Sequence, residues 1–62
     1  MKTVSLITPK TAKAREWIKD MVYYESWQQY GDGIAIEPRM IESIIEGMAE
    51  DGLLAEIDFE VN

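Results

Sequence analysis

The chain contains neither cysteine nor histidine. Without cysteine there is no disulfide and no thiolate ligand. Without histidine there is no imidazole for a metal site, for a Ser-His-Asp triad or for proton transfer near neutral pH. The sequence also lacks a glycine-rich phosphate loop and any nucleophile paired with a base. These absences argue against an enzyme, and we expect a non-enzymatic protein without a metal or other cofactor.

Long apolar runs are also lacking. A membrane-spanning helix needs about 18 or more consecutive apolar residues, and no such run occurs. The apolar stretch at the N-terminus is interrupted by Pro9, too early for a signal peptide. We therefore expect a soluble cytoplasmic protein that does not act at a membrane. Its 62 residues predict a single small domain, residues 1–62, whose marginal core would gain stability from a partner.

The first half of the sequence predicts a strand followed by an amphipathic helix. Residues 3–8 are rich in β-branched side chains, which is typical of a short strand. Thr8 and Pro9 are suited to begin the helix, as its N-cap and its first residue. Apolar residues recur at helical spacing over 14–22. Gly31 offers a left-handed C-terminal cap, so the helix could extend to the residue before it.

The second half predicts a turn, a second helix and a longer strand. Residues 31–33 form the turn, and residues 34–36 are either a very short strand or an extended lead-in. The second helix begins at Pro38 and ends at Gly52. Residues 53–61 alternate between apolar and mostly acidic side chains, which indicates a strand with one face open to solvent.

Together these elements predict an α+β fold of two layers, β-α-(β)-α-β, in which two helices cover one face of a small two- or three-stranded sheet. Gly47 lies on the same side of the second helix as Met40. Either its missing side chain lets another element approach closely, or the glycine is merely tolerated at a cost of about 1 kcal/mol. The exposed edges of so small a sheet could pair with a second copy, which makes a homodimer an open alternative.

Charge is divided unevenly along the chain, whose net charge is −6. Residues 1–19 hold five basic residues and one acidic residue, a balance of +4, whereas residues 20–62 hold one basic and eleven acidic residues, a balance of −10. This asymmetry indicates either a solvated surface or an interaction surface. The acidic residues that we expect to face a partner are Glu42, Glu46 and Glu50 on the second helix and Glu56, Asp58 and Glu60 on the last strand.

Five of the six aromatic residues lie between positions 17 and 30. At about 100° per residue, Tyr23, Trp27 and Tyr30 fall on the side of a continuous helix opposite to Ala14. Two interpretations remain open. The helix could break near Glu25 and return the later aromatics to the core, or it could continue and expose them as an interface, since tryptophan and tyrosine dominate binding hot spots.

Two segments, Thr8-Pro9-Lys10-Thr11-Ala12-Lys13-Ala14-Arg15-Glu16-Trp17 and Ile36-Glu37-Pro38-Arg39-Met40-Ile41, resemble small accessory proteins of bacteriophages and prophages. Such proteins commonly bind and modulate a host protein, and some acidic members imitate DNA. The resemblance covers about a third of the chain and carries over no functional residue. It implies a non-enzymatic binder.

Three functions follow from these patterns. The first is a protein-binding module whose acidic face engages a basic surface, with nucleic-acid mimicry as one form of this. The alternative is a homo-oligomeric structural or regulatory domain that associates through the aromatic residues or a strand edge. The third, which the net negative charge disfavours, is weak nucleic-acid binding. It would use Lys10, Lys13, Arg15, Lys19, Tyr23 and Trp27.

Overall fold

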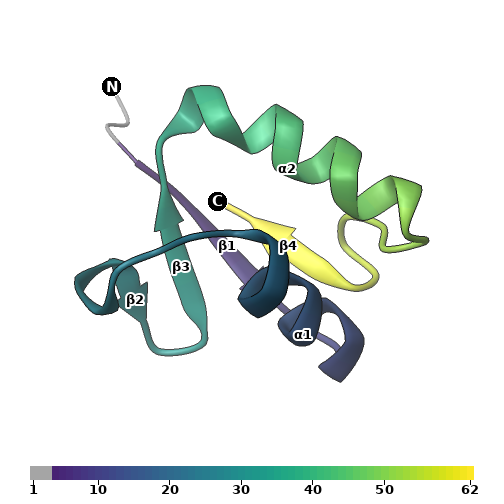
Figure 1. Cartoon of the computed structure of the whole chain (residues 1–62), viewed down its shortest axis with the longest axis horizontal. Helices are drawn as coiled ribbons and strands as arrows, with labels where there is room; N and C mark the ends of the chain where they lie inside the picture. The colour runs from purple at the N-terminus through teal and green to yellow at the C-terminus, as the bar shows by residue number, and fades with distance from the viewer. Residues whose placement is uncertain (1–3) are drawn as a thin grey trace.

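One antiparallel sheet and two helices make up the computed structural model, which describes residues 4–62 (Figure 1). The sheet has four strands in the order β2-β3-β1-β4. A single 3-10 turn, η1, follows the first helix. The elements in chain order are β1 (Ser5–Pro9), α1 (Ala12–Met21), η1 (Ser26–Gln28), β2 (Gln29–Tyr30), β3 (Gly33–Ile36), α2 (Pro38–Glu50) and β4 (Phe59–Val61).

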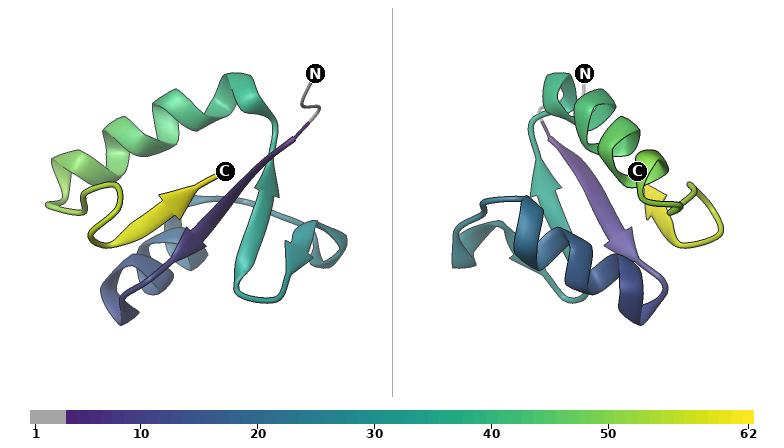
Figure 2. Two further views of the ribbon diagram at one scale, coloured as in Figure 1. Left: turned by 180° about the vertical axis from the view of Figure 1, so that it is seen from behind. Right: turned by 45° about the vertical axis from the view of Figure 1, so that its right-hand side comes forward.

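Both helices cover the same face of the sheet, as the predicted two-layer α+β fold requires (Figure 2). Ile7 of β1 lies opposite Ile34 of β3 on one side and Val61 of β4 on the other. Ile18 of α1 and Met48 of α2 are buried in one cluster with these strands. The sheet has one strand more than the predicted maximum, because the two residues of β2 are too few to show a period in the sequence.

The start of the first helix differs from the prediction. Pro9 ends β1, opposite Phe59, and the helix begins three residues later with Thr11 as its N-cap. The Thr11 hydroxyl accepts a hydrogen bond from the backbone N–H of Ala14 at 3.2 Å. Proline is tolerated in this strand because pairing with β3 stops at Ile7, so its missing N–H removes no bond from the ladder. The predicted strand residue Thr3 lies outside the described residues.

The first helix also ends earlier than either interpretation allowed. It stops at Met21, and Val22 is extended while its N–H still bonds to the carbonyl oxygen of Ile18 at 3.0 Å. Capping by Gly31 is therefore wrong for this helix. Gly31 and Asp32 instead form the turn between β2 and β3. Residues 34–36 are a strand, not an extended lead-in.

The second helix and its glycine agree with the sequence. It starts at Pro38 and ends at Glu50, and Gly52 follows with a left-handed φ of 84°. A Cβ built on Gly47 would lie 3.1 Å from Cζ2 of Trp17. The glycine therefore permits close approach of α1 to α2, which was the first of its two interpretations.

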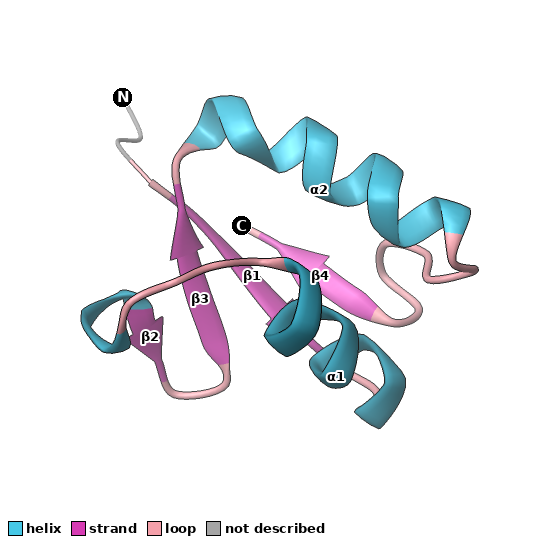
Figure 3. Ribbon diagram, viewed as in Figure 1, coloured by secondary structure: helices cyan, strands magenta, loops and turns pink. Residues whose placement is uncertain are grey.

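The prediction of one long strand over residues 53–61 is wrong for most of its length. Only Phe59–Val61 is a strand, and residues 53–58 form a loop with an isolated bridge from Ala55 to Phe59 (Figure 3). Glu56 has a left-handed φ of 71°, and the Asp58 side chain accepts a hydrogen bond from the N–H of Leu54 at 2.9 Å. A carboxylate that bonds to nearby backbone competes with strand pairing, and alternation alone does not reveal that competition.

Candidate interaction surfaces

Three carboxylates follow one exposed side of α2. Glu42, Glu46 and Glu50 are four residues apart and all exposed. At this spacing, neighbouring side chains on a helix lie about 5–6 Å apart at Cβ. The opposite side of the helix holds Ile44 and Met48 in the core. The acidic ridge, as we call Glu42, Glu46 and Glu50, is therefore fixed in place by apolar packing beneath it.

The other three predicted acidic residues do not form a ladder along one strand. Glu56 lies in the loop, whereas Glu60 lies in β4 with its Cα opposite Thr8. Both are exposed and line one recess beside α2. Asp58 is half-buried, and its carboxylate accepts hydrogen bonds from the Leu54 N–H and, at 3.4 Å, from the Thr11 hydroxyl. Asp58 thus holds the loop against the start of α1, while Glu56 and Glu60 remain open to solvent.

Little of the negative charge is neutralised inside the fold. Across residues 4–62, the only salt bridge joins Arg39 to Glu37, at 3.1 Å, and both side chains are exposed. Lys10, from the basic segment, donates a hydrogen bond to the backbone carbonyl of Glu56 and not to a carboxylate. The acidic ridge therefore has no cation partner among the described residues.

The three predicted interface aromatics are exposed even though the helix ends before them. Tyr23, Trp27 and Tyr30 are 84%, 72% and 61% exposed. Tyr23 and Trp27 line one recess of about 300 Å³ together with Val4 and Met40. Tyr30 does not line this recess, so the structure brings together two of the three.

The sequence pattern missed the contribution of Val4 and Met40 to this surface. They are 51% and 53% exposed. Met40 lies near the start of α2 on the same side as Gly47, and helical spacing alone does not show which apolar residues stay exposed near the end of a helix. The recess formed by these two residues with Tyr23 and Trp27 is called the aromatic recess below.

The hydroxyl of Tyr23 is bound by a neighbouring carboxylate, which shifts its pKa. Its hydroxyl donates a hydrogen bond of 2.6 Å to the carboxylate of Glu25. The bond stabilises the protonated phenol and places a negative charge beside the site of ionisation, which raises the pKa of Tyr23 above its usual value of 10.0. The same hydrogen bond restrains the Tyr23 ring, which lines the aromatic recess together with Trp27.

Local hydrogen bonds occupy one backbone carbonyl near each edge of the sheet, whose edge strands are β2 and β4. On the β2 side, where β3 extends beyond its short partner, the Gln28 amide donates to the carbonyl of Ala35 at 2.9 Å. At the β4 side, the N–H of Glu56 donates to the carbonyl of Phe59 at 2.6 Å. Occupied backbone groups and short strands hinder pairing with another chain. The geometry therefore gives less support to association through a strand edge than to association through the aromatic recess.

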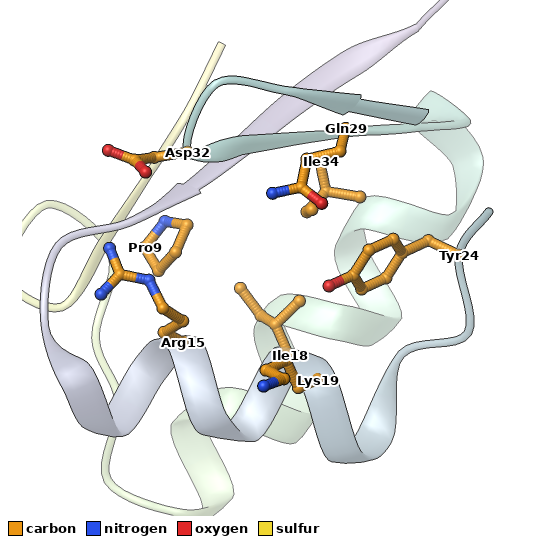
Figure 4. A pocket seen from close by; sticks show the side chains of 8 residues that line it. All are labelled: Pro9, Arg15, Ile18, Lys19, Tyr24, Gln29, Asp32 and Ile34. Carbon is orange, nitrogen blue, oxygen red and sulfur yellow. The ribbon is translucent and has the colours of Figure 1, made fainter. Parts of the chain in front are cut away.

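The basic side chains of α1 lie on a different surface from Trp27. Arg15 and Lys19 line a pocket with Tyr24, between α1 and the β2–β3 hairpin (Figure 4). Among residues 4–62, no lysine or arginine lines the aromatic recess. Lys19 also lines a recess with Tyr23, so these two members of the expected basic and aromatic stripe are adjacent, whereas Trp27 lies in the aromatic recess.

Two further findings concern membranes and metals. In the part of the chain that the structure describes, no helix has the length and apolar character needed to cross a membrane. Within that same part, carboxylates do not gather in threes at distances suited to a metal ion.

Comparison with protein-family models, with curated proteins and with solved structures found no match for this chain. The resemblance to bacteriophage accessory proteins therefore stays a prediction. The class that the fold itself defines is a small α+β domain with a four-stranded antiparallel sheet.

Proposed function

We propose that the protein is a non-enzymatic binding module whose acidic ridge engages a basic surface on a protein partner. The observation that carries this proposal is the unpaired state of Glu42, Glu46 and Glu50 within residues 4–62, on a helix fixed by its apolar side. Glu56 and Glu60 add charge beside α2. An array of this kind speeds association with a basic partner and can imitate the phosphates of a nucleic acid.

A pull-down from bacterial lysate at low and high salt tests the proposal. We expect a basic protein to be retained at low salt by the unchanged chain and to be lost when Glu42, Glu46 and Glu50 are all replaced by glutamine. A matched control replaces three exposed acidic residues elsewhere. These are Glu16→Gln, Asp20→Asn and Asp32→Asn, which change the net charge equally.

The two triple variants separate a specific surface from a general effect of charge. Retention by the control and loss from the ridge variant support the proposal. If the ridge variant retains the same proteins as the unchanged chain, or if both variants lose them equally, the acidic ridge is not the binding surface.

The exposed aromatics favour a second candidate function, self-association through the aromatic recess. Trp27 is 72% exposed at a recess that also contains Val4 and Met40. Exposed clusters of this kind are typical of interfaces. Light-scattering mass should then show a dimer that Trp27→Ala disrupts and Tyr30→Ala, outside the recess, does not. A monomer at high micromolar concentration contradicts this second function.

A further inference from the structure

The pocket between α1 and the β2–β3 hairpin has the composition of a small-ligand site. Its volume is about 310 Å³, at the lower end of the range of roughly 300–1,000 Å³ for ligand clefts. Residues from four separate segments converge on it (Figure 4). They are Pro9 of β1, Arg15, Ile18 and Lys19 of α1, Tyr24 of the following loop, and Gln29, Asp32 and Ile34 of the β2–β3 hairpin.

The base of the pocket is apolar and belongs to the core. Ile18 is 2% exposed and Ile34 is 3% exposed, and Pro9 is buried beside them. These side chains are held by packing on the helix and on the sheet, so the base keeps its shape without a ligand. A rigid apolar base suits a flat or branched hydrocarbon group.

The polar groups around this base are arranged at two ends. Figure 4 shows Arg15 and Asp32 at one end, and Gln29 and Tyr24 toward the other, with the Tyr24 hydroxyl directed into the space. The Gln29 amide donates to the Gly31 carbonyl at 3.3 Å. Within residues 4–62, Arg15 and Asp32 form no salt bridge with each other.

The charge of this pocket opposes that of the chain. Arg15 and Lys19 contribute two positive charges against the single carboxylate of Asp32, whereas the whole chain has a net charge of −6. Neither cation forms a salt bridge with another described residue. The Arg15 guanidinium can therefore hold a carboxylate or phosphate of a ligand by two parallel hydrogen bonds, and Lys19 adds a second positive charge to the lining.

From this arrangement we propose that the pocket binds a small aromatic anion, a carboxylate or a phosphate monoester with one ring. The anionic group contacts Arg15, Lys19 adds positive charge to the same lining, and the ring lies on Ile18 and Ile34 near Tyr24. Asp32 limits the charge that the site accepts, because its carboxylate repels an anion bound to Arg15. This site is on a different part of the molecule from the acidic ridge and does not depend on the proposed protein-binding function.

Titration with 3-phenylpropionate, followed by NMR, tests the site directly. We expect millimolar or tighter binding, with chemical-shift changes at the methyl groups of Ile18 and Ile34 and at the ring of Tyr24. Phenethylamine, which has a similar shape and the opposite charge, should bind at least about tenfold more weakly, since it loses the charge-assisted hydrogen bonds. Phenyl phosphate, titrated in parallel, shows whether the site prefers the phosphate.

Three single variants test the roles of the charged residues. Arg15→Gln should weaken 3-phenylpropionate binding about tenfold, by loss of a bidentate partner. Asp32→Asn should strengthen it roughly threefold, because the repulsion is removed. The matched control is Lys13→Gln, which removes one positive charge from an exposed position of the same helix outside the pocket and should have little effect.

Several results would overturn the proposal. They are an absence of shifts at millimolar 3-phenylpropionate, equal binding of phenethylamine, or equal weakening by Arg15→Gln and Lys13→Gln. Equal weakening by the two variants would show that the positive charge of the whole basic segment attracts the ligand, and not Arg15 in particular. Unchanged far-UV circular dichroism of each variant excludes loss of folding as the cause.

Discussion

Because Gly47 lies close to Trp17, the effect of Gly47→Ala on the free energy of unfolding depends on the side chain at position 17. Replacing glycine by alanine inside a helix normally stabilises it by about 1 kcal/mol. Here the new Cβ would lie 3.1 Å and 3.2 Å from the Cζ2 and Cη2 atoms of Trp17. That is closer than ordinary van der Waals contact, so the indole ring or the helix must shift.

The indole ring is not free to shift without cost. Trp17 packs against the core cluster, and its Nε1–H donates a hydrogen bond to the carboxylate of Asp51, just past the end of α2. Forcing extra volume into a packed contact costs about 1–3 kcal/mol. Subtracting the gain in helix propensity leaves a net destabilisation of about 1 kcal/mol for Gly47→Ala.

Replacing Trp17 by a smaller side chain should turn the destabilisation by Gly47→Ala into a stabilisation. In a Trp17→Phe background the shorter ring removes the atoms that the new Cβ meets, so Gly47→Ala should stabilise by about 0.5–1 kcal/mol. The four proteins of this cycle can be compared by urea unfolding followed by far-UV circular dichroism. In a domain of this size a change of 1 kcal/mol moves the melting temperature by about 4–8 °C, a readily measured shift. If Gly47→Ala stabilises both backgrounds equally, the close approach does not constrain the helix and the argument fails.

Three further predictions concern the loops and the aromatic recess. Asp58→Ala should destabilise the fold by about 1–2 kcal/mol in urea unfolding, because the N–H of Leu54 loses its carboxylate acceptor. Glu56→Gly should stabilise by about 0.5–1 kcal/mol in the same assay, because glycine adopts the left-handed φ of 71° at this position without steric cost. Glu25→Gln should lower the pKa of Tyr23 toward its usual value in a pH titration followed by NMR, since the hydrogen bond to a carboxylate raises it.

The same three variants have results that would contradict the reasoning. An unchanged stability of Asp58→Ala would show that water replaces the carboxylate at Leu54. A loss of stability in Glu56→Gly would show that the Glu56 side chain contributes more than the backbone conformation costs.

For Tyr23, the raised folded pKa implies stabilisation that is present below the unfolded pKa and is lost as pH rises through the folded pKa. An unchanged Tyr23 pKa in Glu25→Gln would assign the shift to another cause.

The sequence predicts those elements whose signals are local and agree with one another. For α2, proline at the start, an apolar stripe with a period of 3.6 and glycine after the end all indicate the same boundaries, and the helix spans Pro38–Glu50. The layer arrangement follows from the apolar faces. At Gly47 the sequence left two interpretations open, close approach of another element or a merely tolerated glycine. A single missing side chain produces no periodicity that could decide between them.

The errors arise where a side chain competes with the backbone ladder. Alternation over residues 53–61 indicates a strand, but the Asp58 carboxylate bonds to the N–H of Leu54 and the chain turns back at Glu56. Likewise, Thr8 with Pro9 predicted the helix start, but Pro9 pairs with Phe59 in the sheet and the helix begins after Thr11. The pairing of Pro9 with Phe59 joins residues fifty positions apart, and no short window of sequence contains both.

The arrangement of the acidic residues could be predicted from the sequence only in part. The spacing of Glu42, Glu46 and Glu50 places them on one helix side, as the structure has them. The grouping of Glu56 with Asp58 required a strand that does not form. Exposure of Tyr23 and Trp27 was one of two outcomes, and the structure reaches it by ending the helix instead of extending it.

The position of β1 between β3 and β4 also orders the assembly of the sheet. Ile7 lies 27 residues before its partner Ile34 and 54 residues before its partner Val61. Doubling a loop adds only about 0.6 kcal/mol of closure entropy, so the unfolded chain has little preference between the two pairings. β3 nevertheless gains a second neighbour in β2, whereas β4 has β1 alone. Of the two pairings that β1 makes, the one with β4 should therefore open first, which would uncover Phe59 and leave the other three strands paired.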